Sequence, residues 1–133
     1  MRIKSVLILV LSLLISQCNS YDAPYTPKGL QITDAYREWK NAKFHEFANF
    51  SVVLANNTDE DFKMVKYRVK IFLVVNGKKT EVFSKAYEYH QRLNSGDVIK
   101  LPIYDLTEFH IGVDIREDNG WTWGGYIEDA TPI

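Results

Sequence analysis

The 133-residue chain contains a single cysteine, Cys18, and only three histidines. One cysteine excludes a disulfide within the chain and any zinc site built from several thiolates. The three histidines, His45, His90 and His110, lie far apart and lack the spacing of a metal-binding motif. We therefore expect no metal site and no cofactor.

The sequence also lacks the usual patterns of catalytic residues. It contains no Gly-x-Ser-x-Gly elbow, and Cys18 lies close to the N-terminus rather than within a folded site. Acidic residues are numerous enough to form a carboxylate pair for glycoside hydrolysis, but no pattern distinguishes any two of them. We expect no catalytic residues and a protein that is not an enzyme. A small hydrolase with an unrecognised carboxylate pair is the least favoured alternative.

No apolar run is long enough to cross a membrane. The run at residues 5–15 has about half of the roughly 20 residues that a spanning helix needs. Two positive charges precede it and small polar residues follow, which is typical of a secretory signal. We expect a signal peptide at residues 1–17, a proline-containing tether at residues 18–28 and one domain at residues 29–133.

The residues around the cysteine, Leu14-Ile15-Ser16-Gln17-Cys18, resemble the lipobox of bacterial lipoproteins. This resemblance implies lipidation of Cys18, a membrane anchor and a location in the cell envelope. Stable anchoring requires more than one acyl chain. The alternative is ordinary cleavage after Ser20, which would release a secreted protein.

The charges are unevenly distributed, although the net charge is only −1. Residues 62–100 contain nine Lys or Arg and three Asp or Glu. Residues 101–133 contain one Lys or Arg and seven Asp or Glu. A basic patch for an acidic partner is one interpretation. We favour basic and acidic strands that lie side by side and pair across a sheet. Because a nucleic-acid binder is expected to be basic overall, we expect no nucleic-acid partner.

The strongest structural pattern lies at residues 62–90. Apolar residues alternate with basic ones along residues 64–75, which predicts a strand with one buried and one wet face. Asn76-Gly77 then supplies the positive backbone angles of a two-residue hairpin turn, and residues 78–90 form the returning strand.

The rest of the chain also favours strands. Residues 34–47 are ambiguous, and we interpret them as a continued strand with a turn near Asn41-Ala42 rather than a helix. Pro102 places its strand at a sheet edge or a bulge. Further strands are expected at residues 29–33, 47–55, 98–104, 109–116 and 121–128. About seven short strands predict an all-β protein, and we expect an immunoglobulin-like antiparallel β-sandwich.

Leu30-Gln31-Ile32-Thr33-Asp34, residues 50–58, residues 65–77 and Ser95-Gly96-Asp97 together resemble the FxLYD-type domains of small bacterial lipoproteins. The order of the strands carries this resemblance, and the family's signature itself is not present. The resemblance implies an extracytoplasmic accessory domain and transfers no catalytic residues.

Two groups of residues are candidates for a contact surface. Lys66, Arg68 and Lys70 form the basic face of the central strand. Trp121 and Trp123 project from one face of the last strand, either as an exposed stacking platform or as core residues between two sheets.

We expect a non-enzymatic, membrane-anchored β-sandwich that serves as a binding or envelope-accessory module with a protein or envelope partner. The alternative is a secreted inhibitor or carbohydrate-binding module that uses the Trp121/Trp123 strand.

Overall fold

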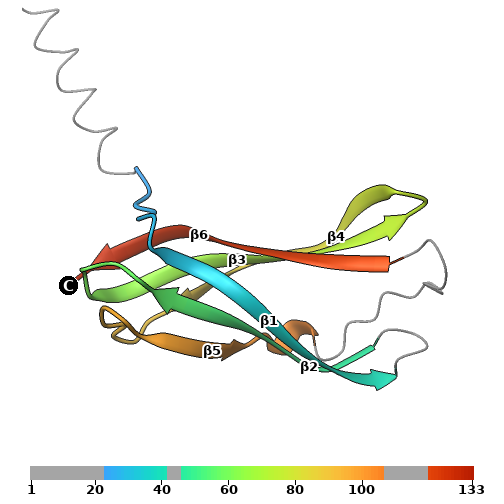
Figure 1. Cartoon of the computed structure of the whole chain (residues 1–133), viewed down its shortest axis with the longest axis horizontal. Coiled ribbons are helices and arrows are strands. Elements are labelled where there is room, and N and C mark those ends of the chain that lie inside the picture. Colours follow the sequence, from blue (N-terminus) through green and yellow to red (C-terminus); the bar gives the residue numbers. More distant parts are fainter. Residues whose placement is uncertain (1–22, 42–45, 107–119) are drawn as a thin grey trace, which may run out of the picture.

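The protein is described by a computed structural model that covers residues 23–41, 46–106 and 120–133 (Figure 1). Nearly all of these residues lie in long strands. The elements are β1 (Leu30–Asn41), β2 (Glu46–Asn56), β3 (Phe62–Val75), β4 (Lys78–Tyr89), β5 (Val98–Pro102), the 3-10 helix η1 (Tyr104–Leu106) and β6 (Gly120–Pro132). Within the described residues, no helix is long and apolar enough to span a bilayer.

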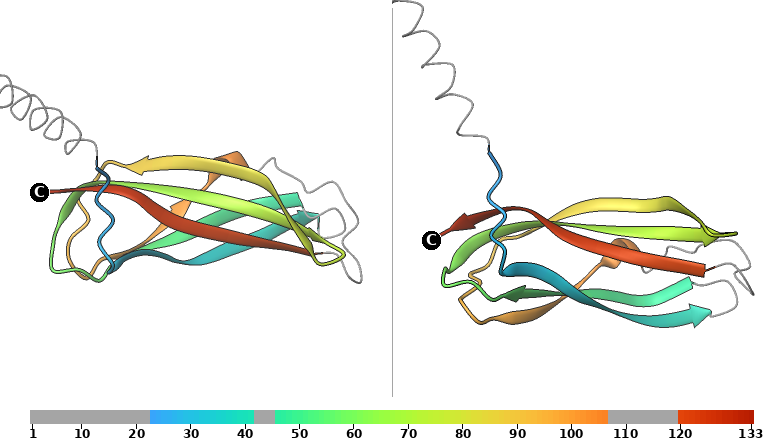
Figure 2. Two further views of the ribbon diagram at one scale, coloured as in Figure 1. Left: turned by 90° about the horizontal axis from the view of Figure 1, so that it is seen from above. Right: turned by 45° about the horizontal axis from the view of Figure 1, so that its top comes forward.

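The six strands form two antiparallel sheets that pack face to face (Figure 2). One sheet has the order β1-β2-β5 and the other has the order β4-β3-β6. The all-β sandwich expected from the sequence is confirmed. The expected strand at residues 109–116 lies outside the described residues.

The predicted hairpin of β3 and β4 is confirmed in register and in turn. Asn76 and Gly77 have φ angles of 50° and 78°, as the two-residue turn requires. The inward-facing residues of β3 are buried, whereas Lys66, Arg68 and Lys70 on the other parity are only half-buried. The ambiguous segment is a strand up to Asn41 and again from Glu46, whereas residues 42–45, which include Ala42 of the expected turn, lie outside the described residues.

β5 pairs only with β2 among the described strands, so Pro102 lies on an edge strand as predicted. The strand is shorter than expected. It ends at Pro102, and the chain turns into η1, which buries Leu106.

The core lies between the two sheets. One cluster joins Phe50 and Val52 of β2 to Tyr67, Val69 and Ile71 of β3. A second cluster, nearer the chain termini, contains Leu30, Leu54, Phe62, Val65, Leu93 and Ala130. Burying these side chains supplies the main stabilising free energy, since no disulfide is available.

Asn56 is the buried polar residue of this core, and its side chain is fully hydrogen-bonded. Its amide group donates to the Glu60 and Leu93 carbonyls at 2.8 and 3.3 Å. Its side-chain oxygen accepts from the backbone N–H and the hydroxyl of Thr58. Asn56 therefore fixes the β2–β3 turn against the loop that contains Leu93.

Gly125 marks a close approach between the two sheets. A Cβ atom at this position would lie 2.7 Å from Cγ2 of Ile32 on β1 and 3.0 Å from the ring of Trp123. Its neighbour Gly124 faces the other side of β6, where a Cβ atom would lie 3.6 Å from Phe72. Of these two neighbouring glycines, Gly125 is therefore the one that lacks room for a side chain.

We predict that Val69→Asp unfolds the domain, because it buries a charge that has no partner inside the core. The side chain of Val69 is fully buried. Lys66→Ala on the adjacent outward position is expected to change the free energy of unfolding by only about a few tenths of a kcal/mol. Urea titration followed by circular dichroism measures both effects, and equal losses would contradict the assignment of faces.

We also predict that Gly125→Ala destabilises the domain by about 1–3 kcal/mol, because the added methyl group forces Ile32 and Trp123 to move. Gly124→Ala is the matched control. It meets an ordinary contact and restricts the unfolded chain, so we expect a change between zero and a gain of about 1 kcal/mol. Thermal unfolding of the two variants tests this, and equal stability would argue against a close approach of β1 and β6.

Candidate functional site

The structure places the two predicted groups of contact residues on opposite faces of one sheet. Lys66, Arg68 and Lys70 point outward from β3. Trp121 and Trp123 point inward from β6, where both are half-buried against the core cluster of Phe50 and Tyr67. The two groups therefore do not form a single surface. Cys18 lies outside the described residues.

The basic face of β3 is partly neutralised by acidic residues of its neighbouring strands. Nε of Arg68 lies 3.1 Å from Oε1 of Glu128 on β6, and Nζ of Lys70 lies 2.8 Å from Oε1 of Glu81 on β4. The hydrogen bond to Glu81 is the main cause of a raised pKa for Lys70. Basic and acidic strands thus lie side by side and pair, which is the interpretation favoured from the charge distribution.

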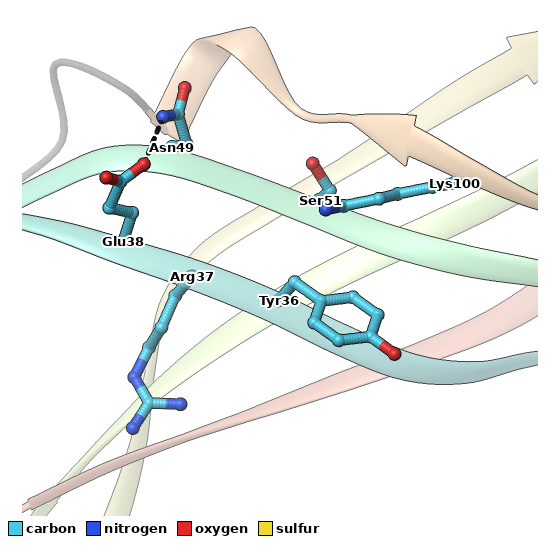
Figure 3. A pocket seen from close by; sticks show the side chains of 6 residues that line it. All are labelled: Tyr36, Arg37, Glu38, Asn49, Ser51 and Lys100. Carbon is cyan, nitrogen blue, oxygen red and sulfur yellow. Dashed lines mark hydrogen bonds between the residues drawn. The ribbon is translucent and has the colours of Figure 1, made fainter.

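A different candidate site is an open hollow of about 410 Å³ on the outer face of the β1-β2-β5 sheet (Figure 3). All three strands of this sheet contribute to it. Its lining residues are Tyr36, Arg37, Glu38, Asn49, Ser51 and Lys100. The volume lies within the range of about 300–1,000 Å³ that is common for ligand sites.

An exposed aromatic ring forms the apolar part of the hollow. Tyr36 is 52% exposed although it lies in the middle of β1. Nζ of Lys100 lies over this ring, 4.8 Å from its centroid. Arg37 projects from the other side of β1 (Figure 3). Its guanidinium lies 5.2 Å from the ring centre of Trp121. Arg37 is exposed and lies at the margin of the hollow, on the side toward Trp121 of β6.

The polar groups of the hollow provide both donors and acceptors. Nδ2 of Asn49 donates to Oε2 of Glu38 at 2.7 Å, which holds the carboxylate in place. Ser51 pairs directly with Tyr36 across β1 and β2, and Lys100 pairs with Val53, the next outward-facing residue of β2. Glu38 is the one carboxylate that lines the hollow in the described part of the chain. The hollow thus combines a carboxylate, an amide, a hydroxyl and an ammonium group as hydrogen-bonding groups.

Sequence reasoning missed Tyr36 because of a β-bulge in β1, and it missed Lys100 because this lysine joins the hollow only through the pairing of β5 with β2. Ile32 pairs with Leu54 and Asp34 pairs with Val53, so Thr33 is an extra residue in β1. The bulge reverses the parity, and Tyr36 points outward instead of joining Leu30 and Ile32 on the inner face. A polar Thr33-Asp34 in an otherwise alternating strand is the only signal of this bulge in the sequence.

A second polar cluster joins β4 to η1. The hydroxyl of Tyr87 donates to Oδ2 of Asp105 at 2.7 Å, and Nζ of Lys85 lies 3.1 Å from the same oxygen. The Tyr87 ring stacks on Tyr67, with ring centres 5.6 Å apart. Burial raises the pKa of Tyr67 to about 12. Burial and the hydrogen bond to Asp105 together raise the pKa of Tyr87 above its ordinary value.

These contacts assign the second cluster to stability. The Tyr87 hydroxyl and, to a smaller extent, Lys85 lower the pKa of Asp105. Asp105 holds η1 on the β4 side of the sandwich, and η1 in turn positions the buried Leu106. No three His, Cys, Asp or Glu residues of the described part of the chain could share a metal ion.

Comparison with known proteins identifies no family model and no curated protein that matches this chain.

We predict that acid weakens the fold through Asp105. Its pKa is lower in the folded protein than its ordinary value of 3.8. The stabilisation is therefore complete above the unfolded-state pKa and is lost as the pH falls through the folded-state pKa. Melting temperatures of wild type and Asp105→Asn, measured between about pH 6 and about pH 2, should converge toward the acid end.

Tyr87→Phe is the control for this pH dependence, because the tyrosine hydroxyl makes the largest contribution to the lowered pKa. In the Tyr87→Phe background, Asp105→Asn should change the melting temperature much less than it does in the wild type. In the Lys85→Gln background, the effect of Asp105→Asn should be reduced by a smaller amount. A constant difference between wild type and Asp105→Asn at every pH would contradict the role of the carboxylate.

Proposed function

We propose that the protein is a non-enzymatic, membrane-anchored module outside the cytoplasm that binds a partner in the cell envelope. Three features support this proposal: the signal-like N-terminus, the lipobox-like residues before Cys18 and the resemblance to FxLYD-type accessory domains. The observation that carries it is the way in which the N-terminal linker joins the sandwich.

Tyr25 fastens the linker to one end of the sandwich. Its backbone N–H donates to Oδ1 of Asp129 on β6, and its hydroxyl donates to Oε1 of Glu60, both at 2.9 Å. Its ring lies 6.4 Å from the ring of Phe62, at the start of β3. The linker is therefore held by three separate elements rather than leaving the domain freely.

This attachment determines how an anchored domain would stand. The chain from Cys18 to Tyr25, with six residues between them, spans at most about 25 Å when extended. Lipidation of Cys18 would keep the end with Tyr25 and the C-terminus close to the bilayer. The Asn76-Gly77 turn lies at the opposite end (Figure 1), beyond the 14-residue β3. The faces of both sheets would then be accessible to envelope partners.

The alternative is a secreted inhibitor or carbohydrate-binding module. Its expected platform, Trp121 and Trp123, is half-buried against the core. The exposed ring of Tyr36 in the hollow of the other sheet favours this class of function at a different place. Binding at this hollow is compatible with either a secreted or an anchored protein.

We predict that the mature protein, isolated from its native cells, begins at Cys18 and has a mass increased by acyl chains. Cys18→Ala should prevent this increase and move the protein from the membrane fraction to the soluble fraction. Cys18 is the only cysteine, so no other thiol can replace it. Intact mass spectrometry and fractionation measure both effects.

Tyr25→Phe is a matched control, because it removes the hydrogen bond to Glu60 without altering the lipidation residue. It should retain acylation and membrane association. An unmodified mass that begins at Asn19 or Tyr21 would contradict the anchored module and favour the secreted alternative.

A further inference from the structure

We propose that the hollow formed by Tyr36, Glu38, Asn49, Ser51 and Lys100 binds a saccharide unit that bears a carboxylate. This inference rests on the proposed binding function and adds a place and a chemical class of ligand. An acidic saccharide requires a surface with an apolar ring, groups that bind hydroxyls and a cation without an acidic partner. The hollow combines all three.

The Tyr36 ring provides the apolar surface. A pyranose ring has one face of C–H groups and a rim of hydroxyls, so it stacks on an aromatic ring while its rim makes hydrogen bonds. Tyrosine offers such a face with little loss of side-chain freedom. Over half of Tyr36 remains accessible although Lys100 lies over its ring. The accessible part of the ring is therefore open to stacking by a ligand.

Glu38, Asn49 and Ser51 match the hydroxyl rim of a sugar. Asn49 uses one amide hydrogen to hold Oε2 of Glu38 (Figure 3), so the other carboxylate oxygen can still accept hydrogen bonds. Ser51 makes no side-chain hydrogen bond to any residue within the described ranges, so its hydroxyl is available as donor and acceptor. These groups lie on adjacent strands, where their positions are more rigid than in loops.

Lys100 makes an acidic sugar the preferred ligand. Within the described part of the chain, no carboxylate lies within 4.0 Å of its Nζ. Arg68 and Lys70 on the other sheet differ in this respect, because Glu128 and Glu81 neutralise them. A carboxylate of the ligand would form a charge-assisted hydrogen bond with Lys100.

The position of the hollow argues against an extended peptide as the ligand. A peptide that adds to a sheet needs the unpaired backbone groups of an edge strand. The hollow is instead centred on β2, whose backbone is paired with β1 on one side and β5 on the other. Recognition here depends on side chains alone, which suits a small polar ring.

The first test is calorimetric titration of the full-length chain in detergent micelles with two probes, trigalacturonate and the neutral maltotriose. Trigalacturonate should bind at least about tenfold more tightly, because only it can pair with Lys100. Its affinity should fall when the salt concentration is raised from about 0.05 M to about 0.5 M, which screens the charge pair. Equal affinity for both probes would overturn the acidic specificity.

The second test uses variants for which the chain offers close controls. Lys100→Gln should weaken trigalacturonate binding by about tenfold and leave maltotriose unchanged. Tyr36→Ser should weaken both probes by about fivefold to tenfold. The controls are Lys70→Gln and Tyr126→Ser, since Nζ of Lys70 lies 5.8 Å from the ring centre of the 45% exposed Tyr126 on the other sheet. These controls should bind as wild type does.

Each remaining outcome has a definite consequence. If Tyr126→Ser and Tyr36→Ser weakened binding equally, the sugar would bind elsewhere and the proposal would be overturned. The absence of binding for both probes would also overturn it. Lys100→Gln alters an exposed side chain, so it remains informative if Tyr36→Ser fails to fold. If the sugars do not bind but Cys18 is acylated, only the saccharide inference fails. If the sugars bind to a protein without acyl chains, only the anchoring fails.

Discussion

The inward-facing residues of β3 are the constraint on which the rest of the structure depends. Val65, Tyr67, Val69 and Ile71 are buried against residues of β2 and β6, and β3 is hydrogen-bonded to β4 on one side and β6 on the other. Side chains of a strand alternate, so a slip of one residue would bury the lysines and expose the core. The same alternation therefore sets the register of both neighbouring strands and directs three cations outward.

This register also separates the aromatic and the charged residues of β6. Trp121 and Trp123 lie opposite Leu73 and Ile71, so they face the core, while Glu128 lies where it meets Arg68. The close approach at Gly125 brings β6 onto β1 and leaves no space there for a side chain. Packing thus accounts for the tryptophans, and ion pairs account for most of the basic face. Neither feature requires a ligand to explain it.

Local patterns in the sequence were sufficient to predict the parts of the fold that depend on neighbouring residues. The β3–β4 hairpin follows from strict alternation and Asn76-Gly77, and the edge position of β5 follows from Pro102. The hollow could not be predicted in this way, because it combines three strands and depends on the bulge at Thr33. This bulge reverses the parity of the β1 residues that follow it up to Glu38, where the register shifts again, and the residue types alone do not specify where it occurs.

The outer faces of the two sheets differ in the surroundings of a similar tyrosine–lysine pair. Each presents a tyrosine with a lysine over its ring, Tyr126 with Lys70 and Tyr36 with Lys100. Lys70 also pairs with Glu81, which explains its position by cross-strand attraction. A lysine on the edge strand β5 can protect against aggregation, which would explain the charge of Lys100. Protection of an edge does not require the other groups beside this lysine, which are the exposed ring of Tyr36, the carboxylate of Glu38 and the hydroxyl of Ser51. The combination at the hollow is better explained by a ligand.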